Sequence, residues 1–536
     1  MLIGVSKLDM ATAKEAGERA GATISFWERT AQKFYTAPVS ENLTTHVCVI
    51  GAGIAGVTSA YLAAREGRDV VLIDDGPVGG GMTGRTTAHL VNALDDRYFE
   101  VEKMLGAECG RRYAESHIAA IDQVEAIVAK EKINCNFERL DGYLFLPPGG
   151  SVTDLKRELE AAHRAGLTEV ERIDAVPIGQ FNTDGVLRFP RQAQFHPLHY
   201  LNGVARAIVD LGGRIRTGTR AIKIQGGDPV KIETSIGHTI TARAAVVATN
   251  CPINDRLVIH SKQAPYATYV IGMRVTGEVE HALLWDTAMT AEDEKQKLGP
   301  VPYHYVRFAR DDQGEVLIVG GEDHKTGQAE DFEQRFAKLE RWTRDHFPFV
   351  GEVTDRWSGQ VMEPVDGVAY IGRNPGDKNV YVVSGDSGNG ITHGTIAGML
   401  IVDLICGREN PWAKLYDPAR KTLKPIVVAD YVTENANVAA QFRDYVTAGD
   451  VSSVDDIKPG EGAIMREGSK KIAAYRDENG TLHKFSAVCP HLRCIVRWDG
   501  CEKTWDCPCH GSRFDALGHV LNGPAISDLE ALENST

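Results

Sequence analysis

The sequence has 536 residues and a formal net charge of −14 at pH 7. This length exceeds what one hydrophobic core supports, so we expect several domains. The negative charge disfavours nucleic acid or an anionic membrane as a partner. Five of the ten cysteines fall between residues 489 and 509 and the others stand singly, unlike the framework of a secreted disulfide-rich protein. No stretch predicts a signal peptide or a bilayer-spanning helix, so we expect a cytoplasmic protein.

After an N-terminal lead-in (1–44), residues 45–75 form an apolar run, a glycine-rich turn, a helical segment and a second apolar run with an acidic end. This order is typical of a βαβ unit that binds a dinucleotide. The glycines permit a tight turn, close approach of the pyrophosphate at the helix N-terminus, and close packing of helix on strand. They are Gly51, Gly53 and Gly56. Asp74, at the acidic end, is placed to accept a hydrogen bond from a ribose hydroxyl.

The stretch GGGMTGRTTAHL (79–90) follows Asp74 too soon to be a second fingerprint, and we find no other. A nicotinamide-linked flavin reductase of the disulfide-reductase type would carry one. The stretch instead resembles the loop that passes close to the flavin ring in amine and amino-acid oxidases of the D-amino-acid oxidase superfamily. The resemblance implies that FAD is the dinucleotide, and it assigns three residues of this loop to FAD: Arg85, Thr86 and Thr87.

Three further stretches resemble parts of the same superfamily. Residues 212–224 look like the strand near the adenine, and 241–250 like the strand that returns to the nucleotide fold. Residues 379–407 predict a buried strand, a glycine-rich turn and a helix. The N-terminus of such a helix can point its N–H groups at the flavin edge where negative charge develops on reduction. The alternative is that this segment is an ordinary core helix that makes no flavin contact. The flavin contacts expected here are Gly390, Ile391 and Thr392.

Residues 97–200 and 266–349 are predicted to form the substrate layer over the flavin. Within the β-rich run 303–310, side chains alternate between the two faces of a strand, so Tyr303, Tyr305 and Arg307 share one face and His304 takes the other. An aromatic and cationic face would suit a substrate with an amine and a carboxylate. The alternative, strand residues without a substrate contact, stays equally open.

Two histidines have more than one interpretation. His393, beside the expected flavin contact, has three interpretations: it orients substrate, it stabilises reduced flavin, or it caps the helix. His89 lies in a region where some members of the superfamily link FAD covalently through a histidine. The local match is offset, so we favour non-covalent FAD.

Near the end of the chain, CPHLRC (489–494) and DCPCHGSRFD (506–515) each hold a cysteine–histidine pair. Thiolates and imidazoles together select zinc or iron–sulfur. A Rieske centre uses two cysteines on one iron and two histidines on the other, whereas a structural zinc finger usually keeps its cysteines in one half and its histidines in the other. The mixed halves therefore favour a Rieske-type 2Fe-2S cluster, with a zinc knuckle or a disulfide-bonded pair of loops as the alternative. The expected ligands are Cys489, His491, Cys507 and His510.

These loops also resemble the Rieske domain of the cytochrome bc type. The resemblance implies a disulfide between Cys494 and Cys509, which sit where that family joins its cluster-binding loops. High-potential members have a tyrosine that hydrogen-bonds a cysteine ligand. This chain has Phe514 there and keeps Ser512, so we expect a potential in the lower part of the Rieske range.

Together these features predict an α/β protein with a Rossmann-like FAD-binding domain, an inserted α+β substrate domain of the D-amino-acid oxidase type, and a small C-terminal all-β Rieske domain. The expected bounds are 45–420 for the flavoprotein, 421–450 for a linker with a helix at 436–446, and 451–536 for the Rieske domain.

This combination implies that a small amine or amino acid is oxidised at its C–N bond, with hydride passing to FAD and the imine being hydrolysed. Electrons then pass singly to the cluster and to an external one-electron acceptor. The choice between oxidase and dehydrogenase stays open. The alternatives are an electron-transfer reductase that feeds an oxygenase and a redox-sensing protein.

Overall fold

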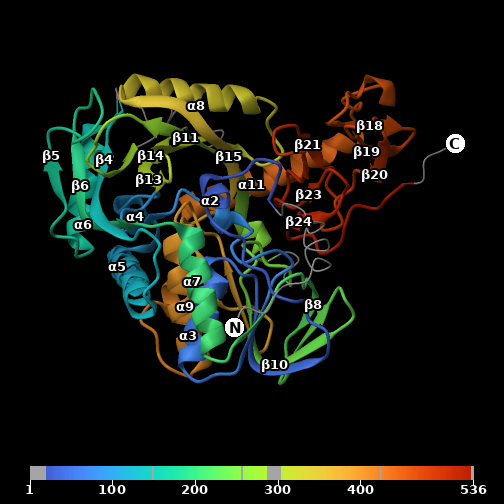
Figure 1. Cartoon of the computed structure of the whole chain (residues 1–536), viewed down its shortest axis with the longest axis horizontal. Coiled ribbons are helices and arrows are strands. Elements are labelled where there is room, and N and C mark those ends of the chain that lie inside the picture. The colour runs from blue at the N-terminus through green and yellow to red at the C-terminus, as the bar shows by residue number, and fades with distance from the viewer. Residues whose placement is uncertain (1–19, 148–149, 255–257, 287–302, 423, 533–536) are drawn as a thin grey trace.

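The computed structural model of the protein describes residues 20–147, 150–254, 258–286, 303–422 and 424–532. Two large sheets lie one above the other, and a small β domain sits against the end of both (Figure 1). The expected fold class is confirmed: a Rossmann-like sheet with helices, a second mixed sheet inserted into it, and a C-terminal all-β domain.

The nucleotide-binding sheet has the strand order β16-β17-β10-β1-β2-β7. The pairs β1–β2, β1–β10, β10–β17 and β2–β7 are parallel, while β16 is antiparallel to β17. β1 ends in an unbroken buried apolar run because both faces of a parallel sheet are covered. The strand bounds are β1 Leu43–Ile50, β2 Val70–Ile73, β7 Arg214–Arg216, β10 Thr239–Val247, β16 Tyr370–Arg373 and β17 Val380–Ser384.

Helices cover one face of this sheet, and two antiparallel strands that extend from β10 pack over the other (Figure 1). α3 and α9 pack closely against each other at Gly394. A larger residue would not fit there, since an added Cβ would lie 2.5 Å from Cγ2 of Ile54. The helices are α3 (Ile54–Arg65), α5 (Ala107–Glu131), α7 (Pro197–Asp210), α9 (Gly390–Ile405) and α10 (Ala413–Tyr416), and the strands are β8 (Ala221–Gln225) and β9 (Val230–Thr234).

The second sheet has the order β15-β11-β14-β13-β12-β4-β6-β3, with β5 paired to β6. Both segments expected to form the substrate layer contribute strands to it. α8 (Phe332–His346) lies across its outer face and buries Phe336 and Leu339 there (Figure 1). The remaining bounds are β3 His89–Leu90, β4 Glu138–Phe145, β5 Glu171–Ile173, β6 Val186–Gln194, β11 Gln263–Val275, β12 Leu283–Asp286, β13 His304–Asp311, β14 Gly314–Lys325, β15 Val350–Pro364, α4 Tyr98–Leu105 and α6 Val152–Arg164.

The C-terminal domain consists of a three-stranded and a four-stranded antiparallel sheet around a core that includes Trp505 and Phe514. The two cluster motifs occupy the loops β20–β21 and β22–β23. The strands are β18 (Glu461–Glu467), β19 (Lys470–Arg476), β20 (Leu482–Ser486), β21 (Arg497–Asp499), β22 (Thr504–Asp506), β23 (Arg513–Asp515) and β24 (Val520–Asn522).

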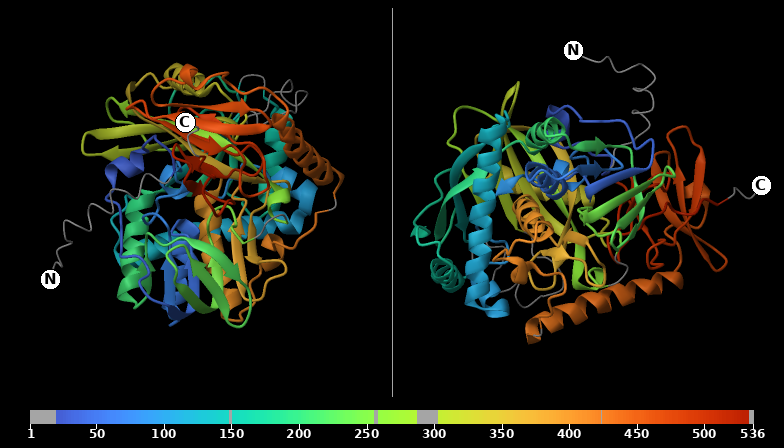
Figure 2. Two further views of the ribbon diagram at one scale, coloured as in Figure 1. Left: turned by 90° about the vertical axis from the view of Figure 1, so that its right-hand side faces the viewer. Right: turned by 90° about the horizontal axis from the view of Figure 1, so that it is seen from below.

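Between the flavoprotein and this domain, α11 (Pro425–Gln441) runs along the surface (Figure 2). The helix expected at 436–446 thus begins eleven residues earlier, because Pro425 occupies the first helical position, where its missing N–H costs nothing. The short 3-10 segments are η1 (Met82–Arg85), η2 (His260–Lys262), η4 (Phe442–Tyr445) and η5 (Val454–Asp456). Among the described residues, no helix combines the length and apolar character needed to cross a bilayer.

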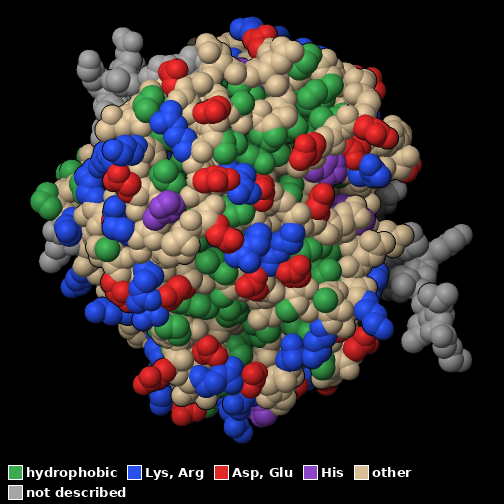
Figure 3. Space-filling view, turned by 90° about the vertical axis from the view of Figure 1, so that its left-hand side faces the viewer, with side chains coloured by type: hydrophobic (Ala, Val, Ile, Leu, Met, Phe, Trp, Pro, Cys, Tyr) green, Lys and Arg blue, Asp and Glu red, His purple; other side chains and the backbone are tan. Residues whose placement is uncertain are grey.

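The described part of the lead-in, residues 20–44, is built into the fold. α2 (Phe26–Thr30) starts with a capping box between Ser25 and Glu28, and it buries Phe26 and Trp27 completely. On the face of the molecule formed by the second sheet and its helices, acidic and basic side chains are interspersed (Figure 3). Ion pairs such as Arg188 with Glu171 connect them.

Candidate functional site

A continuous cavity lies between the two sheets. The helices that pack on the nucleotide-binding sheet contribute the N-termini of α3 and α9. The second sheet contributes residues of β11, β13, β14 and β15. The loop that contains η1 closes one side. Residues 520–526 of the C-terminal domain, except Pro524, line the cavity as well.

One end of the cavity fits a dinucleotide. Gly51 has φ +104°, a conformation that favours glycine, and a Cβ added at Gly56 would lie 1.8 Å from the carbonyl oxygen of Gly51. α3 begins directly after Gly53, which has no side chain to cap it, so the N-terminus of the helix faces the cavity, and the N–H of Ile54 donates to the hydroxyl of Thr83 (3.1 Å). Asp74 lines the cavity, and its carboxylate accepts hydrogen bonds from the backbone N–H groups of Ala52 (2.6 Å) and Gly76 (2.7 Å).

The loop expected to contact the flavin has two different roles. Thr86 and Thr87 line the cavity. Arg85 also contributes to the lining, but its guanidinium is fully buried and donates to the carbonyl oxygens of Thr23 and Ser358 and to the carboxylate of Glu502 (2.9 Å). The charge of Arg85 is therefore used to hold protein segments together.

The N-terminus of α9 reaches the cavity as expected for a helix that follows a glycine-rich turn. Gly390 and Ile391 line the cavity. Thr392 does not belong to the lining; its hydroxyl donates to the carbonyl oxygen of Val91 (3.4 Å), because the next residue of a helix points about 100° away.

Both histidines of the cavity have partners within the protein. His393 Nδ1 lies 2.8 Å from the carbonyl oxygen of Asp386, so it carries the proton, and Nε2 accepts from the hydroxyl of Tyr113 (3.0 Å). His89 has Thr87 Oγ1 and the carbonyl oxygen of Val306 as partners. Burial lowers the pKa of His393 to about 4 and that of His89 to about 3, so both are neutral at pH 7.

Only some of the residues expected to face the substrate from the strand at 303–307 reach the cavity. Tyr303 and Tyr305 line the cavity, with ring centroids 5.3 Å apart. His304 takes the other face and stacks on Trp342 at 3.9 Å. Arg307 is absent from the cavity lining: it is buried and donates to the carbonyl oxygens of Thr87, Ala88 and Phe195. Burial lowers its pKa to about 9, and the expectation of a cationic face toward the substrate is not met.

The sequence did not predict three carboxylates that line the cavity, those of Asp95, Asp323 and Asp386. Burial is the main cause that raises their pKa values, to about 7 for Asp95 and to about 6 for Asp323 and Asp386. They come from three separate loops or strands, and no spacing connects them. The only local signal is the pair of aspartates at 95–96 just after an apolar run.

In the C-terminal domain, the expected cluster ligands come together from two loops. The thiols of Cys489 and Cys507 lie within hydrogen-bond reach of each other, and the rings of His491 and His510 lie 5.0 Å apart by centroid. Two thiols in contact with each other and two imidazole rings in contact with each other match the donor set of a Rieske centre. Nδ1 of His510 is a buried polar atom without a hydrogen-bond partner among the described residues, as expected for a nitrogen that binds a metal.

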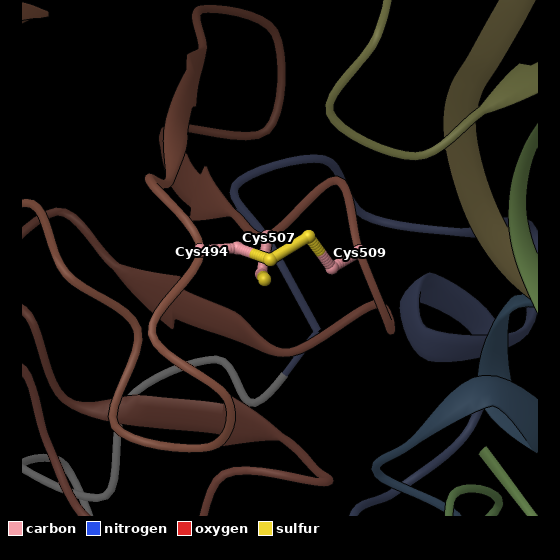
Figure 4. A group of neighbouring side chains, drawn as sticks. All are labelled: Cys494, Cys507 and Cys509. Atoms are coloured by element: carbon pink, nitrogen blue, oxygen red, sulfur yellow. A yellow bond between two sulfur atoms is a disulfide. The ribbon is translucent and has the colours of Figure 1, made fainter. Parts of the chain in front are cut away.

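A disulfide bond joins Cys494 and Cys509, and it holds the two loops together beside Cys507 (Figure 4). The sulfur atoms of these three cysteines lie within 4.8 Å of one another. Because two of them form the disulfide, Cys507 is the one that can offer a thiolate. The hydroxyl of Ser512 hydrogen-bonds Cys489, while Phe514 is fully buried and has no hydroxyl.

The cluster loops face the flavoprotein. Gln360 of β15 lines the cavity, and its Nε2 donates to the carbonyl oxygen of Gly511 (3.0 Å), the residue after His510. The ring of His260 contacts the rings of both His491 (5.0 Å) and His510 (6.1 Å). No sequence pattern pointed to either Gln360 or His260, because the contacts join segments about 150 residues or more apart.

Comparison with known proteins agrees with this arrangement. Residues 46–404 match the family described as FAD dependent oxidoreductase, and residues 447–533 match the Rieske [2Fe-2S] domain. The Rieske 2Fe-2S iron-sulfur protein YhfW of Bacillus subtilis (strain 168) is 30% identical over 97% of this chain and 98% of its own length.

Two further proteins resemble the flavoprotein part. Gamma-glutamylputrescine oxidoreductase of Escherichia coli (strain K12) is 26% identical over 72% of this chain and 89% of its own length. The crystal structure of glycine oxidase from Geobacillus kaustophilus has a TM-score of 0.59 at 17% identity, and the match covers 71% of this chain and 100% of that one. The latter shows the shared fold. The chain is therefore an enzyme of the FAD-dependent oxidoreductase (DAO) family that carries a C-terminal Rieske [2Fe-2S] domain, and its cofactors are FAD and a 2Fe-2S cluster.

Proposed function

We propose that this enzyme oxidises a C–N bond of a small amine or amino acid at FAD and that the electrons leave one at a time through the Rieske cluster to an external acceptor. FAD takes two electrons as hydride, whereas the cluster carries one. The substrate carbon loses hydride and the nitrogen a proton, and water then hydrolyses the imine. The names of two relatives, gamma-glutamylputrescine oxidoreductase and glycine oxidase, support this substrate class.

The contact of Gln360 with Gly511 carries the proposal. One buried side chain both lines the cavity and hydrogen-bonds the loop that holds His510. This contact supports electron transfer within the chain, without a diffusible carrier between the two redox sites, because it joins the wall of the cavity to the cluster-binding loop.

The residues of the cavity have distinct tasks in this proposal. Gly51, Gly53 and Asp74 hold the dinucleotide end, and the N-terminus of α9 stabilises negative charge on reduced flavin. Tyr303 and Tyr305 are half-buried and present their rings to the cavity, where they exclude water and orient the amine. His393 acts as a positioning residue, since its Nδ1–H holds the carbonyl oxygen of Asp386 in the loop before α9.

Low-temperature EPR of the anaerobic protein tests the direction of electron flow. The protein is mixed separately with NADH, NADPH, and a panel of amines and amino acids. A reduced Rieske signal with an amine, and none with a nicotinamide, is the expected result. A signal with NADH or NADPH alone would overturn the proposal in favour of a reductase that feeds an oxygenase. Reduction without any turnover would make the protein a redox sensor.

A further inference from the structure

The half of the cavity that contains Tyr303 and Tyr305 is called the substrate half here. Its lining has acidic side chains and no unpaired basic side chain among the described residues. Asp95, Asp323 and Asp386 line this half. Among the described residues of the lining, the arginines are Arg85 and Arg220. Both are already paired: Arg85 binds Glu502 (2.9 Å), and Arg220 binds Asp75 (3.1 Å) and Asp528 (3.3 Å).

Asp95 lies at the flavin side of this region. Its Oδ2 is so close to Gly388, two residues before α9, that an added Cβ there would lie 2.0 Å away. Tyr303 hydrogen-bonds its carboxylate. The nearest guanidinium, that of Arg97, donates to the carbonyl oxygens of Leu94 and Asp286 instead. Asp95 therefore has a hydroxyl partner and, within the described part of the chain, no salt bridge, although the charge of Arg97 acts on its carboxyl group through space.

Asp323 lies on β14 of the second sheet and lines the same half of the cavity. Its Oδ1 is a buried atom with no hydrogen-bond partner among the described residues. Arg335 lies near it but donates to the main-chain carbonyl oxygens of Glu322 and Asp323 and pairs with Asp331. Thr268 hydrogen-bonds the Asp323 carboxylate, so Asp323 has a hydroxyl partner, as Asp95 has, and a protonated amine in the cavity would add a charged donor.

Further acidic groups lie behind these two. The hydroxyl of Ser387 lies 2.6 Å from Asp96 and 2.8 Å from Glu363. Burial raises the pKa of Glu363 well above its usual range and that of Asp96 to about 6, so Glu363 holds a proton next to Ser387. A substrate carboxylate placed here would meet acidic groups and, among the described lining residues, only guanidinium groups that are already paired.

We infer that the natural substrate is a cationic amine with a second positive charge and without a carboxylate, a diamine or polyamine, and that Asp95 and Asp323 bind its two nitrogen-bearing ends. This inference rests on the proposed function and narrows it to one substrate class. Neither carboxylate needs to react: each supplies an acceptor and a charge that fix the chain of the amine across the rings of Tyr303 and Tyr305. The specificity comes equally from the repulsion of substrates that bear a carboxylate.

Three compounds of similar length test the inference on the FAD-loaded protein: 1,5-diaminopentane, pentylamine and 5-aminopentanoate. Dissociation constants are measured by isothermal titration calorimetry, which does not depend on turnover, and flavin bleaching is followed under anaerobic conditions. We expect the diamine to bind at least about tenfold more tightly than pentylamine, about 1.4 kcal/mol, and 5-aminopentanoate to bind most weakly. Binding of 5-aminopentanoate as tight as that of the diamine would overturn the inference.

Variants sharpen the assignment to individual residues. Asp323→Asn should reduce the preference for the diamine over pentylamine by about tenfold and leave the affinity for pentylamine within a factor of two or three. Asp95→Asn should weaken both amines. The matched control is Asp345→Asn, an exposed aspartate of α8 outside the cavity, which should change neither. If both cavity variants keep the wild-type preference, the inference is wrong. If no amine bleaches the flavin, the proposed function itself fails, and the two outcomes are thus distinguishable.

Discussion

Arg85 and Glu502 form a buried salt bridge of 2.9 Å between the loop at the flavin end of the cavity and the Rieske domain. The side chains are 1% and 0% exposed, respectively. Glu502 also accepts hydrogen bonds from the hydroxyls of Thr23 (2.5 Å) and Ser358 (2.6 Å). One carboxylate therefore ties together the N-terminal segment, β15, the flavin loop and the C-terminal domain.

Replacing Glu502 with glutamine should destabilise the protein strongly. The buried guanidinium of Arg85 would lose its counter-charge, which typically costs about 3–5 kcal/mol. We expect a lower apparent Tm and faster loss of FAD on dilution, both measured by flavin fluorescence during heating and dialysis. Glu530→Gln is the control, since Glu530 is exposed. Equal stability of both variants would mean that the salt bridge does not hold the domains together.

Replacing Gln360 with leucine should slow electron transfer from the flavin to the cluster. The variant keeps a similar volume but loses the hydrogen bond to Gly511. We expect flavin reduction at the wild-type rate, followed by cluster reduction slower by about one order of magnitude, since the lost bond is worth roughly 1 kcal/mol and also fixes the loop. Stopped-flow absorbance resolves the two phases, and Gln313→Leu, at an exposed turn, serves as the control. An unchanged second phase would exclude Gln360 from the route.

The pKa of Asp95 predicts a pH dependence of stability. Its carboxyl ionises near pH 7 in the folded protein, against 3.8 for an unperturbed aspartate. Between these values the unfolded chain binds fewer protons than the folded one, so this group lowers stability as pH rises. Asp95→Asn removes this penalty. The ligand-free variant should match the wild type closely at pH 4 and exceed it at pH 8 by about 4 kcal/mol, given about 1.4 kcal/mol per pKa unit.

Denaturant titrations at the two pH values measure this difference, with Asp345→Asn as a control for the loss of one charge. A gap between the Asp95→Asn variant and the wild type that is the same at pH 4 and pH 8 would contradict the assignment. The gap at pH 8 should also shrink when 1,5-diaminopentane is added, because a bound cation offsets the buried charge of Asp95 in the wild type alone.

The reduction potential of the cluster should respond to substitutions at Ser512 and Phe514. Ser512→Ala removes the hydroxyl that hydrogen-bonds this cysteine, so the potential should fall. Phe514→Tyr supplies a hydroxyl, so the potential should rise within the range of about −150 to +300 mV that Rieske centres span. Redox titration followed by EPR measures both. A potential that stays the same in both variants would show that these positions do not tune it.

Residues close together in the sequence were the predictable ones. The glycines at 51, 53 and 56 and the cysteine–histidine pairs have meaning through spacing alone, since a tight turn or a metal loop is a local structure. Alternation correctly placed Tyr303 and Tyr305 on one face of a strand, but it could not tell how far along that face the cavity extends. Arg307 lies on the same strand beyond the cavity, over the ring of Trp27 (4.9 Å), a residue 280 positions away.

The contacts between distant segments could not be predicted from spacing. Glu502 reaches Arg85 across 417 residues, and Gln360 reaches Gly511 across 151. Asp95 and Asp323 come together only when the second sheet closes over the nucleotide-binding sheet. Each of these side chains is unremarkable in its own sequence neighbourhood, because its partner is chosen by the packing of whole domains.

The segment formed by β24 and the residues after it brings the C-terminal domain into the wall of the flavoprotein's cavity. Residues 520–526, except Pro524, line the cavity, and Arg220 holds the segment through the carbonyl oxygen of Val520 and the carboxylate of Asp528. Because Arg220 also pairs with Asp75, beside Asp74, the segment is fixed to the part of the nucleotide-binding domain that follows β2. The Rieske domain is therefore a structural part of the dinucleotide site as well as the carrier of the cluster.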